Sequence, residues 1–151
     1  MGGDWVESST QFGTPICDLA TCGMGGGTGP YAGTFWAWFG GSNVGPEQAS
    51  VSQSVVIPVG MATLEFQFEI PSCEDPFFAS DSFQVRVDGN VVFQTSNSDP
   101  SCAVVGYQLK SVDISSYANG ASHTVSFTGT TDDVFDPTNF MVDDVRLTGC
   151  Q

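Results

Sequence analysis

Polar and apolar residues alternate strictly along one central stretch of the chain. In residues 64–70, Leu, Phe, Phe and Ile occupy every second position, with Glu, Gln and Glu between them. This period of two is typical of a β-strand that turns one face to a core and the other to water. Residues 82–87 repeat the pattern, with Gln84 and Arg86 on the predicted outer face. The tripeptide Asp88-Gly89-Asn90 that follows predicts a tight hairpin turn, because Gly and Asn tolerate positive φ.

Eight stretches have the composition and length of strands. They share β-branched and aromatic residues and are bounded by Gly, Pro, Asn, Asp or Ser. They are residues 34–39, 51–57, 62–70, 82–87, 90–95, 104–113, 122–128 and 139–148. A chain of 151 residues suits a single core, so we predict one all-β domain over residues 1–151, an antiparallel β-sandwich of the jelly-roll kind. Residues 1–33 show no periodicity and are predicted to form an irregular, Gly- and Cys-rich opening segment.

The charge of the chain narrows the classes of partner. There are 17 acidic residues and three basic ones, giving a formal net charge of −14, so a nucleic acid or an anionic lipid surface would be repelled. Hydrophobic residues make up 40% of the chain, without a run long enough to cross a bilayer. We therefore predict a soluble globular protein with no nucleic-acid partner and no membrane insertion.

The order of the loops predicts which of them meet. In an antiparallel sandwich successive loops lie at alternate ends, which places loops 40–50, 71–81, 96–103 and 129–138 together. The acidic residues that gather at this end are Glu47, Glu74, Asp75, Asp81, Asp99, Asp132, Asp133 and Asp136. Calcium takes about six to eight oxygen ligands from carboxylates and loop carbonyls, so this end is a candidate calcium site. A solvated acidic rim without an ion is the alternative.

The cysteines indicate the compartment. The loop order brings Cys73 close to Cys102, and Cys17 and Cys22 are near enough in sequence to close a small loop, which leaves Cys150 over. We predict two disulfides, because cysteines in turn-rich segments of a short chain are typical of secreted proteins. The start of the chain lacks the basic and apolar regions of a signal peptide, so a signal is expected upstream of this fragment. The expected location is secreted or on the cell surface.

Two groups of side chains are candidates for ligand binding. The predicted outer face of the central sheet carries groups that could hydrogen-bond sugar hydroxyls: Glu65, Gln67, Glu69, Gln84, Arg86, Gln108 and Lys110. Cross-strand ion pairs on an ordinary sheet surface are the alternative explanation. Trp36 and Trp38 lie in a run that is apolar on both faces, so they are either buried or form a stacking platform for a carbohydrate. The ligand-binding residues we predict are Trp36, Trp38, Glu65, Gln67 and Arg86.

Two adjacent carboxylates stand inside the last predicted strand. Asp143 and Asp144 lie between Val142 and Val145, so at least one of them points towards the interior. A buried carboxylate requires a cation, an arginine or backbone N–H groups beside it. A bound ion is the sharper hypothesis.

The sequence offers little for catalysis. The single histidine, His123, lies in a predicted strand without a Gly-x-Ser-x-Gly motif or a Cys–His arrangement, so we predict a structural role for it. Glu65 and Glu69 share a face, as paired carboxylates of jelly-roll glycoside hydrolases do. Four residues of strand separate them by roughly 13 Å, however, which is too far for such a pair. We expect no enzyme, and a small glycoside hydrolase is the least favoured alternative.

Five spaced segments resemble MAM domains, the extracellular modules of meprins and receptor tyrosine phosphatases, and related bacterial jelly-roll modules. The segments are Gly33–Trp38, Ala49–Ser54, Ala62–Phe66, Asp81–Gly89 and Phe140–Leu147, with Cys150 just behind. The resemblance covers residues 30–150 and implies a jelly-roll sandwich with an adhesion or recognition role. It also implies a structural calcium ion held partly by Asp143, with Asp144 behind it, as in carbohydrate-binding modules of similar fold. Residues Thr28-Gly29-Pro30 lack the early acidic ligand of the family, which Glu47 or backbone carbonyls would replace.

These features together predict a non-catalytic binding or adhesion module of a larger secreted or surface protein. Its expected cofactor is a structural calcium ion held by Asp143, Asp144 and Glu47, and its expected partner is an extracellular glycan or protein. A glycan-binding module attached to a secreted enzyme is the alternative function.

Overall fold

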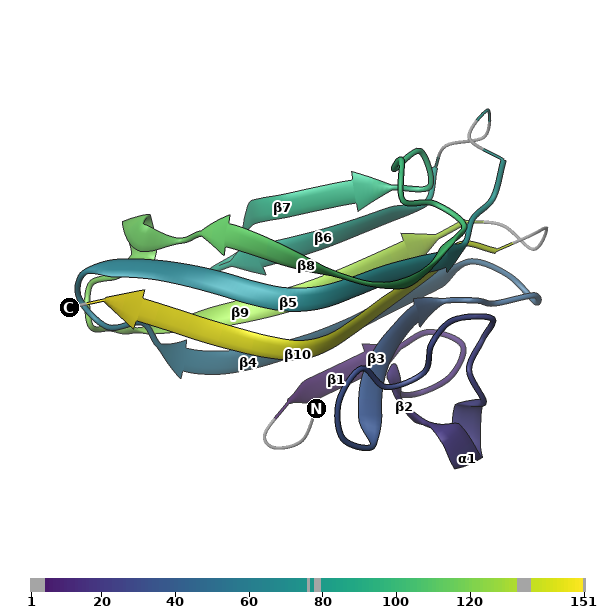
Figure 1. Ribbon diagram of the computed structural model, residues 1–151, viewed down its shortest axis with the longest axis horizontal. Helices are drawn as coiled ribbons and strands as arrows, with labels where there is room; N and C mark the ends of the chain where they lie inside the picture. Colours follow the sequence, from purple (N-terminus) through teal and green to yellow (C-terminus); the bar gives the residue numbers. More distant parts are fainter. Residues whose placement is uncertain (1–4, 76, 78–79, 133–136, 151) are drawn as a thin grey trace.

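Two antiparallel sheets of five strands each pack face to face (Figure 1). The computed structural model describes residues 5–75, 77, 80–132 and 137–150, without the side chain of Cys150. The first sheet has the strand order β1-β4-β9-β6-β7, and the second sheet has the order β2-β3-β10-β5-β8. The predicted all-β sandwich is therefore confirmed.

The strands follow the predicted stretches closely. Those of the first sheet are β1 (Val6–Ser9), β4 (Glu47–Val56), β9 (Ser122–Thr131), β6 (Ser82–Val87) and β7 (Asn90–Ser96). Those of the second sheet are β2 (Ile16–Asp18), β3 (Phe35–Gly40), β10 (Asn139–Cys150), β5 (Met61–Ser72) and β8 (Val104–Asp113). The described residues also form the short helix α1 (Leu19–Cys22) and the 3-10 helix η2 (Ser115–Tyr117). The eight predicted strands correspond to β3 to β10.

The opening segment differs from the irregular structure predicted for it. It contributes β1, which pairs with the edge of β4, and β2, which pairs with β3. Both strands are three or four residues long, too short to display a period, and their partners come from elsewhere in the chain. The α1 helix follows β2 and is capped by Asp18, whose carboxylate accepts the Thr21 N–H at 2.8 Å. That bond holds the pKa of Asp18 below its usual range.

The single polar sheet face expected from the sequence is split between the two sheets. Strand β5 lies between β10 and β8, whereas β6 lies between β9 and β7 in the other sheet. Glu65 and Gln67 therefore belong to the second sheet and Arg86 to the first. The prediction was wrong because it paired β5 with β6, and these consecutive strands cross from one sheet to the other. Lys110 was also predicted on the outer face, but it lies on the core side of β8. It pairs with Phe66, and its ammonium nitrogen lies 5.9 Å from the centroid of the Phe68 ring.

Aromatic rings fill the space between the sheets. Phe83 stands at the centre, and its ring lies 4.8 Å from Phe68, 5.4 Å from Phe39 and 5.7 Å from Phe140, measured between centroids. Each of these four residues is at most 1% exposed. Apolar burial of this kind is the dominant stabilising contribution in a sandwich. No helix among the described residues is long and apolar enough to span a membrane.

The predicted hairpin turn between β6 and β7 is present. Asp88 has a φ of 49° and Gly89 a φ of 80°, the pair of positive values that a two-residue hairpin turn favours. The Asp88 carboxylate accepts the Thr124 N–H at 2.9 Å and contacts His123 Nδ1 at 2.7 Å. His123 also contacts the Asn119 side-chain oxygen at 3.0 Å, which agrees with the structural role predicted for it. The hydrogen bond from His123, followed by that from Thr124, lowers the pKa of Asp88.

We expect Asp88→Asn to lower the melting temperature at pH 6, with a difference that shrinks in acid. A carboxylate with a lowered folded-state pKa stabilises the fold above its unfolded pKa, and this stabilisation disappears as pH falls through the folded value. The gap between wild type and variant should therefore begin to close below about pH 3.8. Asparagine keeps the turn because it tolerates positive φ. Melting curves from pH 6 to pH 2.5 test this, and a constant gap throughout would contradict it.

Candidate functional site

A buried carboxylate fastens the opening segment across the outer face of the second sheet. Glu69 on β5 accepts the backbone N–H and the hydroxyl of Thr28, at 3.1 and 2.9 Å, and the N–H of Gly106 at 2.6 Å. Tyr107 on β8 donates its hydroxyl to the carbonyl of Gly29 at 2.8 Å. Burial, followed by the charges of Asp143 and Glu69, raises the pKa of Tyr107 far above its usual range, so this hydroxyl remains a donor.

Asp143 fastens the next part of the same segment. One of its carboxylate oxygens accepts the N–H groups of Tyr31 and Ala32, at 2.8 and 3.0 Å, and the other accepts the N–H of Asp144 at 2.7 Å. The side chain is 1% exposed. A buried carboxylate requires a cation, an arginine or backbone N–H groups, and the structure provides backbone N–H groups to both oxygens of Asp143. Asp144 pairs instead with Arg146, at 2.6 Å.

The segment covers one of the two candidate tryptophans and leaves part of the other accessible. Trp36 is fully buried beside Cys17 and Met141, so its ring offers no face to a ligand. Trp38 on the same strand is half-buried. A β-carbon on Gly25 would stand 2.3 Å from its ring, so only glycine permits this approach of the backbone.

Trp38 forms a shared wall of two surface cavities. The first has a volume of about 360 Å³ and is mainly apolar, with Phe12, Ile16 and the Cys17–Cys22 disulfide in its lining. The second has a volume of about 520 Å³ and includes amide and hydroxyl groups. Its lining consists of Gly25, Trp38, Gly41, Asn43, Pro71, Ser72, Cys73, Ala103, Pro137 and Asn139. Both volumes lie in the range of about 300–1,000 Å³ that small-molecule sites occupy.

A chain of hydrogen bonds fixes the orientation of the Trp38 ring. The indole N–H donates to the side-chain oxygen of Asn139 at 2.6 Å, and the amide nitrogen of Asn139 donates to the Ser72 hydroxyl at 2.5 Å. Ser72 in turn donates to the carbonyl of Pro137 at 3.3 Å. A ring held in this way loses little side-chain entropy when a ligand stacks on it. The arrangement combines an oriented aromatic surface with adjacent polar groups.

The remaining predicted ligand-binding residues lie elsewhere. Glu65 and Gln67 are on the second sheet and Arg86 is on the first, and none of the three lines either cavity. Arg86 donates to the Gln84 side chain at 2.5 Å and to the Gly89 carbonyl at 2.8 Å. Of the predicted ligand-binding residues, Trp38 therefore lies at the candidate site, whereas Glu65, Gln67 and Arg86 lie away from it. It adds Asn43 and Asn139, which no periodicity marks because both precede or begin strands at the loop end.

The three predicted metal ligands do not come together. Glu47 lies on the first sheet and Asp143 and Asp144 on the second, and they form no group of carboxylate oxygens within 4.8 Å. Glu47 is 1% exposed, and its two oxygens accept the Ser9 hydroxyl at 2.5 Å and the Gln11 N–H at 2.7 Å. Its observed contacts therefore hold the β1 strand and the turn after it against β4.

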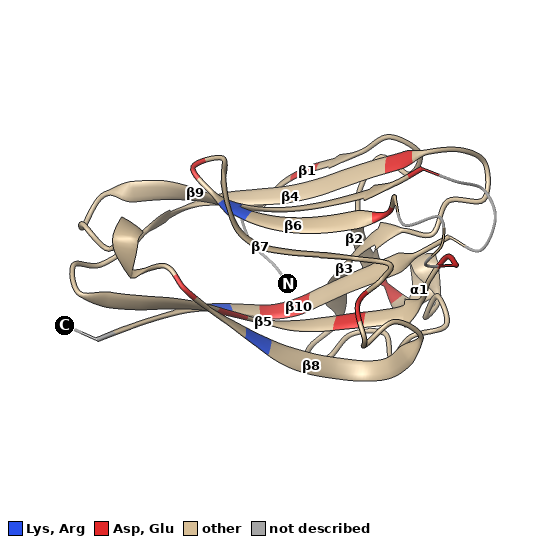
Figure 2. Cartoon of the chain, turned by 90° about the horizontal axis from the view of Figure 1, so that it is seen from above, with Lys and Arg blue, Asp and Glu red and all other residues tan. Residues whose placement is uncertain are grey.

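The predicted loop end does gather acidic residues. Red segments at the ends of β4 and β6 lie at the same end of the sandwich in Figure 2. Carboxylate oxygens of Glu74, Asp81 and Asp132 lie within 4.8 Å of one another. Asp133 and Asp136, which were predicted at the same end, are outside the described residues.

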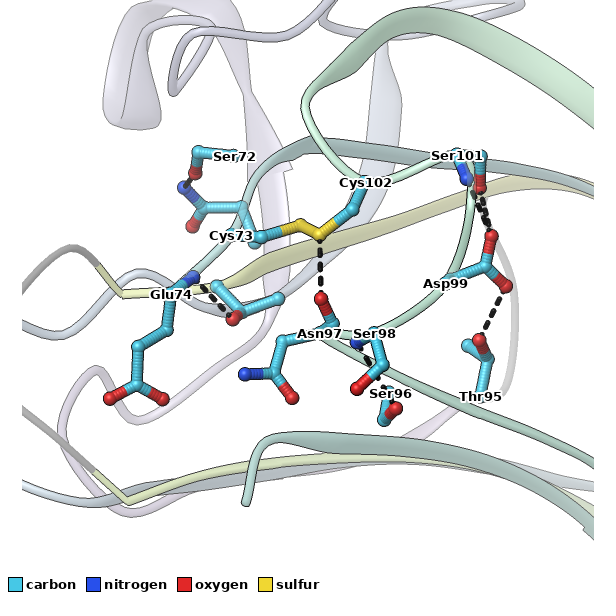
Figure 3. The surroundings of a disulfide bond; sticks show 12 residues. Ser72, Cys73, Glu74, Thr95, Ser96, Asn97, Ser98, Asp99, Ser101 and Cys102 are labelled. Atoms are coloured by element: carbon cyan, nitrogen blue, oxygen red, sulfur yellow. Dashed lines mark hydrogen bonds between the residues drawn. A yellow bond between two sulfur atoms is a disulfide. The ribbon is translucent and has the colours of Figure 1, made fainter. Parts of the chain in front are cut away.

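Both predicted disulfides are present. Cys17–Cys22 closes the loop around α1, and Cys73–Cys102 joins the loop after β5 to the loop before β8 (Figure 3). The second of these confirms that the 71–81 and 96–103 loops meet. The side chain of the fifth cysteine, Cys150, lies outside the described part of the chain.

The carboxylate of Asp99 shapes the loop that precedes β8, beside the Cys73–Cys102 disulfide. Asp99 accepts the N–H and hydroxyl of Ser101, at 2.8 and 2.6 Å, and the hydroxyl of Thr95 at 2.6 Å (Figure 3). Burial by itself would raise the pKa of Asp99, but these hydrogen bonds and the charge of Lys110 hold it below its usual range. The carboxylate is thus used within its own turn.

Comparison with known proteins shows a likeness of fold. No family model and no curated protein matches the sequence. Among solved structures, TmCBM61 in complex with β-1,4-galactotriose has a TM-score of 0.60 and 11% identity, over 97% of this chain and 88% of that one. The K2 cleaved adhesin domain of Lys-gingipain has a TM-score of 0.56 and 11% identity, over 98% and 90%. A carbohydrate-binding module of the β-sandwich superfamily, described as having promiscuous specificity, has a TM-score of 0.56 and 10% identity, over 95% and 56%.

Proposed function

We propose that this domain binds a carbohydrate at the cavities around Trp38 and acts as a non-catalytic glycan-binding module of a secreted or surface protein. The observation that carries the proposal is the orientation of a half-buried indole ring between two cavities, beside the amides of Asn43 and Asn139. Aromatic rings present an apolar surface to the C–H face of a sugar, and amides hydrogen-bond its hydroxyls. The carbohydrate-binding modules of similar fold support the same function.

We propose a non-catalytic role because the two carboxylates considered for catalysis lie away from the cavities. Glu65 and Glu69, the acids that could have formed a glycosidase pair, line neither cavity. Glu69 accepts three hydrogen bonds from Thr28 and Gly106, so its oxygens are used structurally. Recognition of a sugar without cleavage fits this arrangement better.

Isothermal titration with a panel of oligosaccharides that includes β-1,4-galactotriose tests the proposal. We expect Trp38→Ala to weaken binding at least about tenfold, as is usual for an aromatic residue at the centre of a binding site. Trp38→Phe should have an intermediate effect, because it keeps a ring but loses the bond to Asn139. Phe35→Ala is the matched control: Phe35 lies on the same strand, is 40% exposed and lines neither cavity.

Two outcomes would overturn the proposal. One is that no oligosaccharide of the panel binds, and the other is that Trp38→Ala binds as tightly as wild type. Circular dichroism of each variant verifies that the sandwich is intact, so that a loss of binding reports on the site.

A further inference from the structure

A row of buried polar side chains closes the inner face of the first sheet at the acidic end. Strand β6 pairs with both β9 and β7 through Ser82. One residue earlier, Asp81 continues both registers and stands between Thr131 and Asn97, and the Asn97 N–H donates to the Asp81 carbonyl at 3.3 Å. Alternate residues of a strand face the same way, and Phe83 points into the core. The side chains of Asp81, Thr131 and Asn97 therefore share its inward face.

These inward side chains are almost completely shielded from water. Asp81 is 2% exposed, and Asn97 and Thr131 are each 1% exposed. Neither amide atom of Asn97, nor the hydroxyl of Thr131, has a hydrogen-bond partner within the part of the chain that the structure describes. Buried amides and hydroxyls are nearly always paired, because leaving them unpaired is costly. An amide in this position indicates a ligand that the described residues do not supply.

Two further carboxylates complete the cluster. Glu74 is 7% exposed, and its N–H donates to the Thr138 hydroxyl at 3.1 Å. Asp132 donates its N–H to the Asp81 carboxylate at 3.0 Å. Figure 3 shows the side chains of Glu74 and Asn97 extending to the same side of the Cys73–Cys102 disulfide. Glu74 and Asp81 are buried and Asp132 is exposed, and the oxygens of the three carboxylates lie within 4.8 Å of one another, so their negative charges repel.

We propose that Glu74, Asp81, Asp132 and the side-chain oxygen of Asn97 bind a calcium ion, with the Thr131 hydroxyl facing the same space. The donors are all oxygens and come from separate segments of the chain, which matches the hard, flexible coordination of calcium. Zinc prefers nitrogen and sulfur ligands, and the nearby Cys73 and Cys102 are joined to each other. Magnesium retains several waters and is held by fewer protein ligands.

The ion would join the two loops that border the second cavity. Glu74 directly follows Ser72 and Cys73 of its lining, and Asp132 precedes the loop that carries Pro137. The site does not depend on the glycan proposal, because calcium binding is measured without any sugar. If the domain binds calcium at these residues but binds no oligosaccharide, the calcium site is supported and the glycan-binding proposal is overturned.

Calcium titration of chelator-treated protein is the test, by calorimetry and by melting temperature at constant ionic strength. We expect one ion per chain, a higher melting temperature in calcium, and a smaller effect of magnesium. Asp81→Asn should weaken calcium binding by roughly tenfold or more, since ligand charge sets affinity at such sites. Asp75→Asn is the matched control, because it removes the same charge from an exposed neighbour of Glu74 and can still accept the Phe77 N–H.

Asn97→Asp gives an independent result if Asp81→Asn fails to fold. A fourth carboxylate should lower the melting temperature in chelator, and saturating calcium should remove most of that loss. A merely structural asparagine would show the same loss in both conditions, which would overturn the proposal. The proposal is also overturned if wild type takes up no calcium, or if Asp75→Asn weakens binding as much as Asp81→Asn.

Discussion

Asp143→Ala is expected to lower the free energy of unfolding by about 3–5 kcal/mol, because three backbone N–H groups lose a charged acceptor that is 1% exposed. The substitution leaves the N–H groups of Tyr31, Ala32 and Asp144 without their acceptor. A hydrogen bond to a charged group contributes about 1.5–3 kcal/mol, so the loss of three such bonds reaches this range even where water replaces the acceptor at the exposed residues Tyr31 and Ala32. Urea denaturation with a constant m-value measures the loss.

Asp144→Asn is the matched control for that measurement. Asp144 has a φ of 48°, which asparagine tolerates, and its partner Arg146 is 64% exposed. A surface ion pair of this kind contributes less than about 1 kcal/mol. The loss in Asp143→Ala should also be equal in calcium and in chelator. A loss that appears only in calcium would contradict the structural role and return Asp143 to the metal ligands.

The contacts of Asp143 show how far the sequence could predict a buried carboxylate. Strand periodicity indicates that a carboxylate in β10 is buried and requires a partner. The choice among a cation, an arginine and backbone N–H groups depends on residues 31 and 32, which are more than 100 positions away. Their position follows from how the opening segment crosses the sheet. Nothing in that segment's own pattern encodes the crossing.

The strands themselves were predictable because one face of each is apolar. Period-two alternation located β5 and β6, and the positive-φ residues Asp88 and Gly89 located the turn after them. The parity of the loops then predicted the Cys73–Cys102 disulfide. The lateral partner of each strand was not predictable in the same way. Alternation reports which side chains face inward, and both β5 and β6 satisfy it from different sheets.

The candidate site was predicted in part for a related reason. Trp36 and Trp38 are two residues apart on one strand and share a face, so the sequence treats them alike. The difference arises from what surrounds each ring: Trp36 packs in a buried cluster with Cys17 and Met141, and Trp38 lies between two cavities. The glycines that approach Trp38, Gly25 and Gly41, have φ values of 57° and 74°. A Gly-rich segment beside a tryptophan was the available signal, but it did not indicate which ring it would contact.

Replacing Cys73 and Cys102 together by serine is expected to lower the free energy of unfolding by about 3.5 kcal/mol. The bond links positions 29 residues apart, and the entropy that such a loop denies to the unfolded chain corresponds to this value. The same relation gives about 2 kcal/mol for Cys17 and Cys22, which are five residues apart. The double serine variant at 17 and 22 is therefore the matched control, and denaturant unfolding of both should rank them in this order.

The two bonds also differ in what they join. Cys73–Cys102 holds together the loops that carry Glu74 and Asn97, so its removal should additionally weaken calcium binding at the proposed site. Cys17–Cys22 lines the first cavity, so its removal should leave calcium affinity unchanged. A reversed order of stabilities would show that the Cys73–Cys102 loops are already close in the unfolded chain. Equal calcium affinity in the two variants would show that the strand register alone positions the ligands.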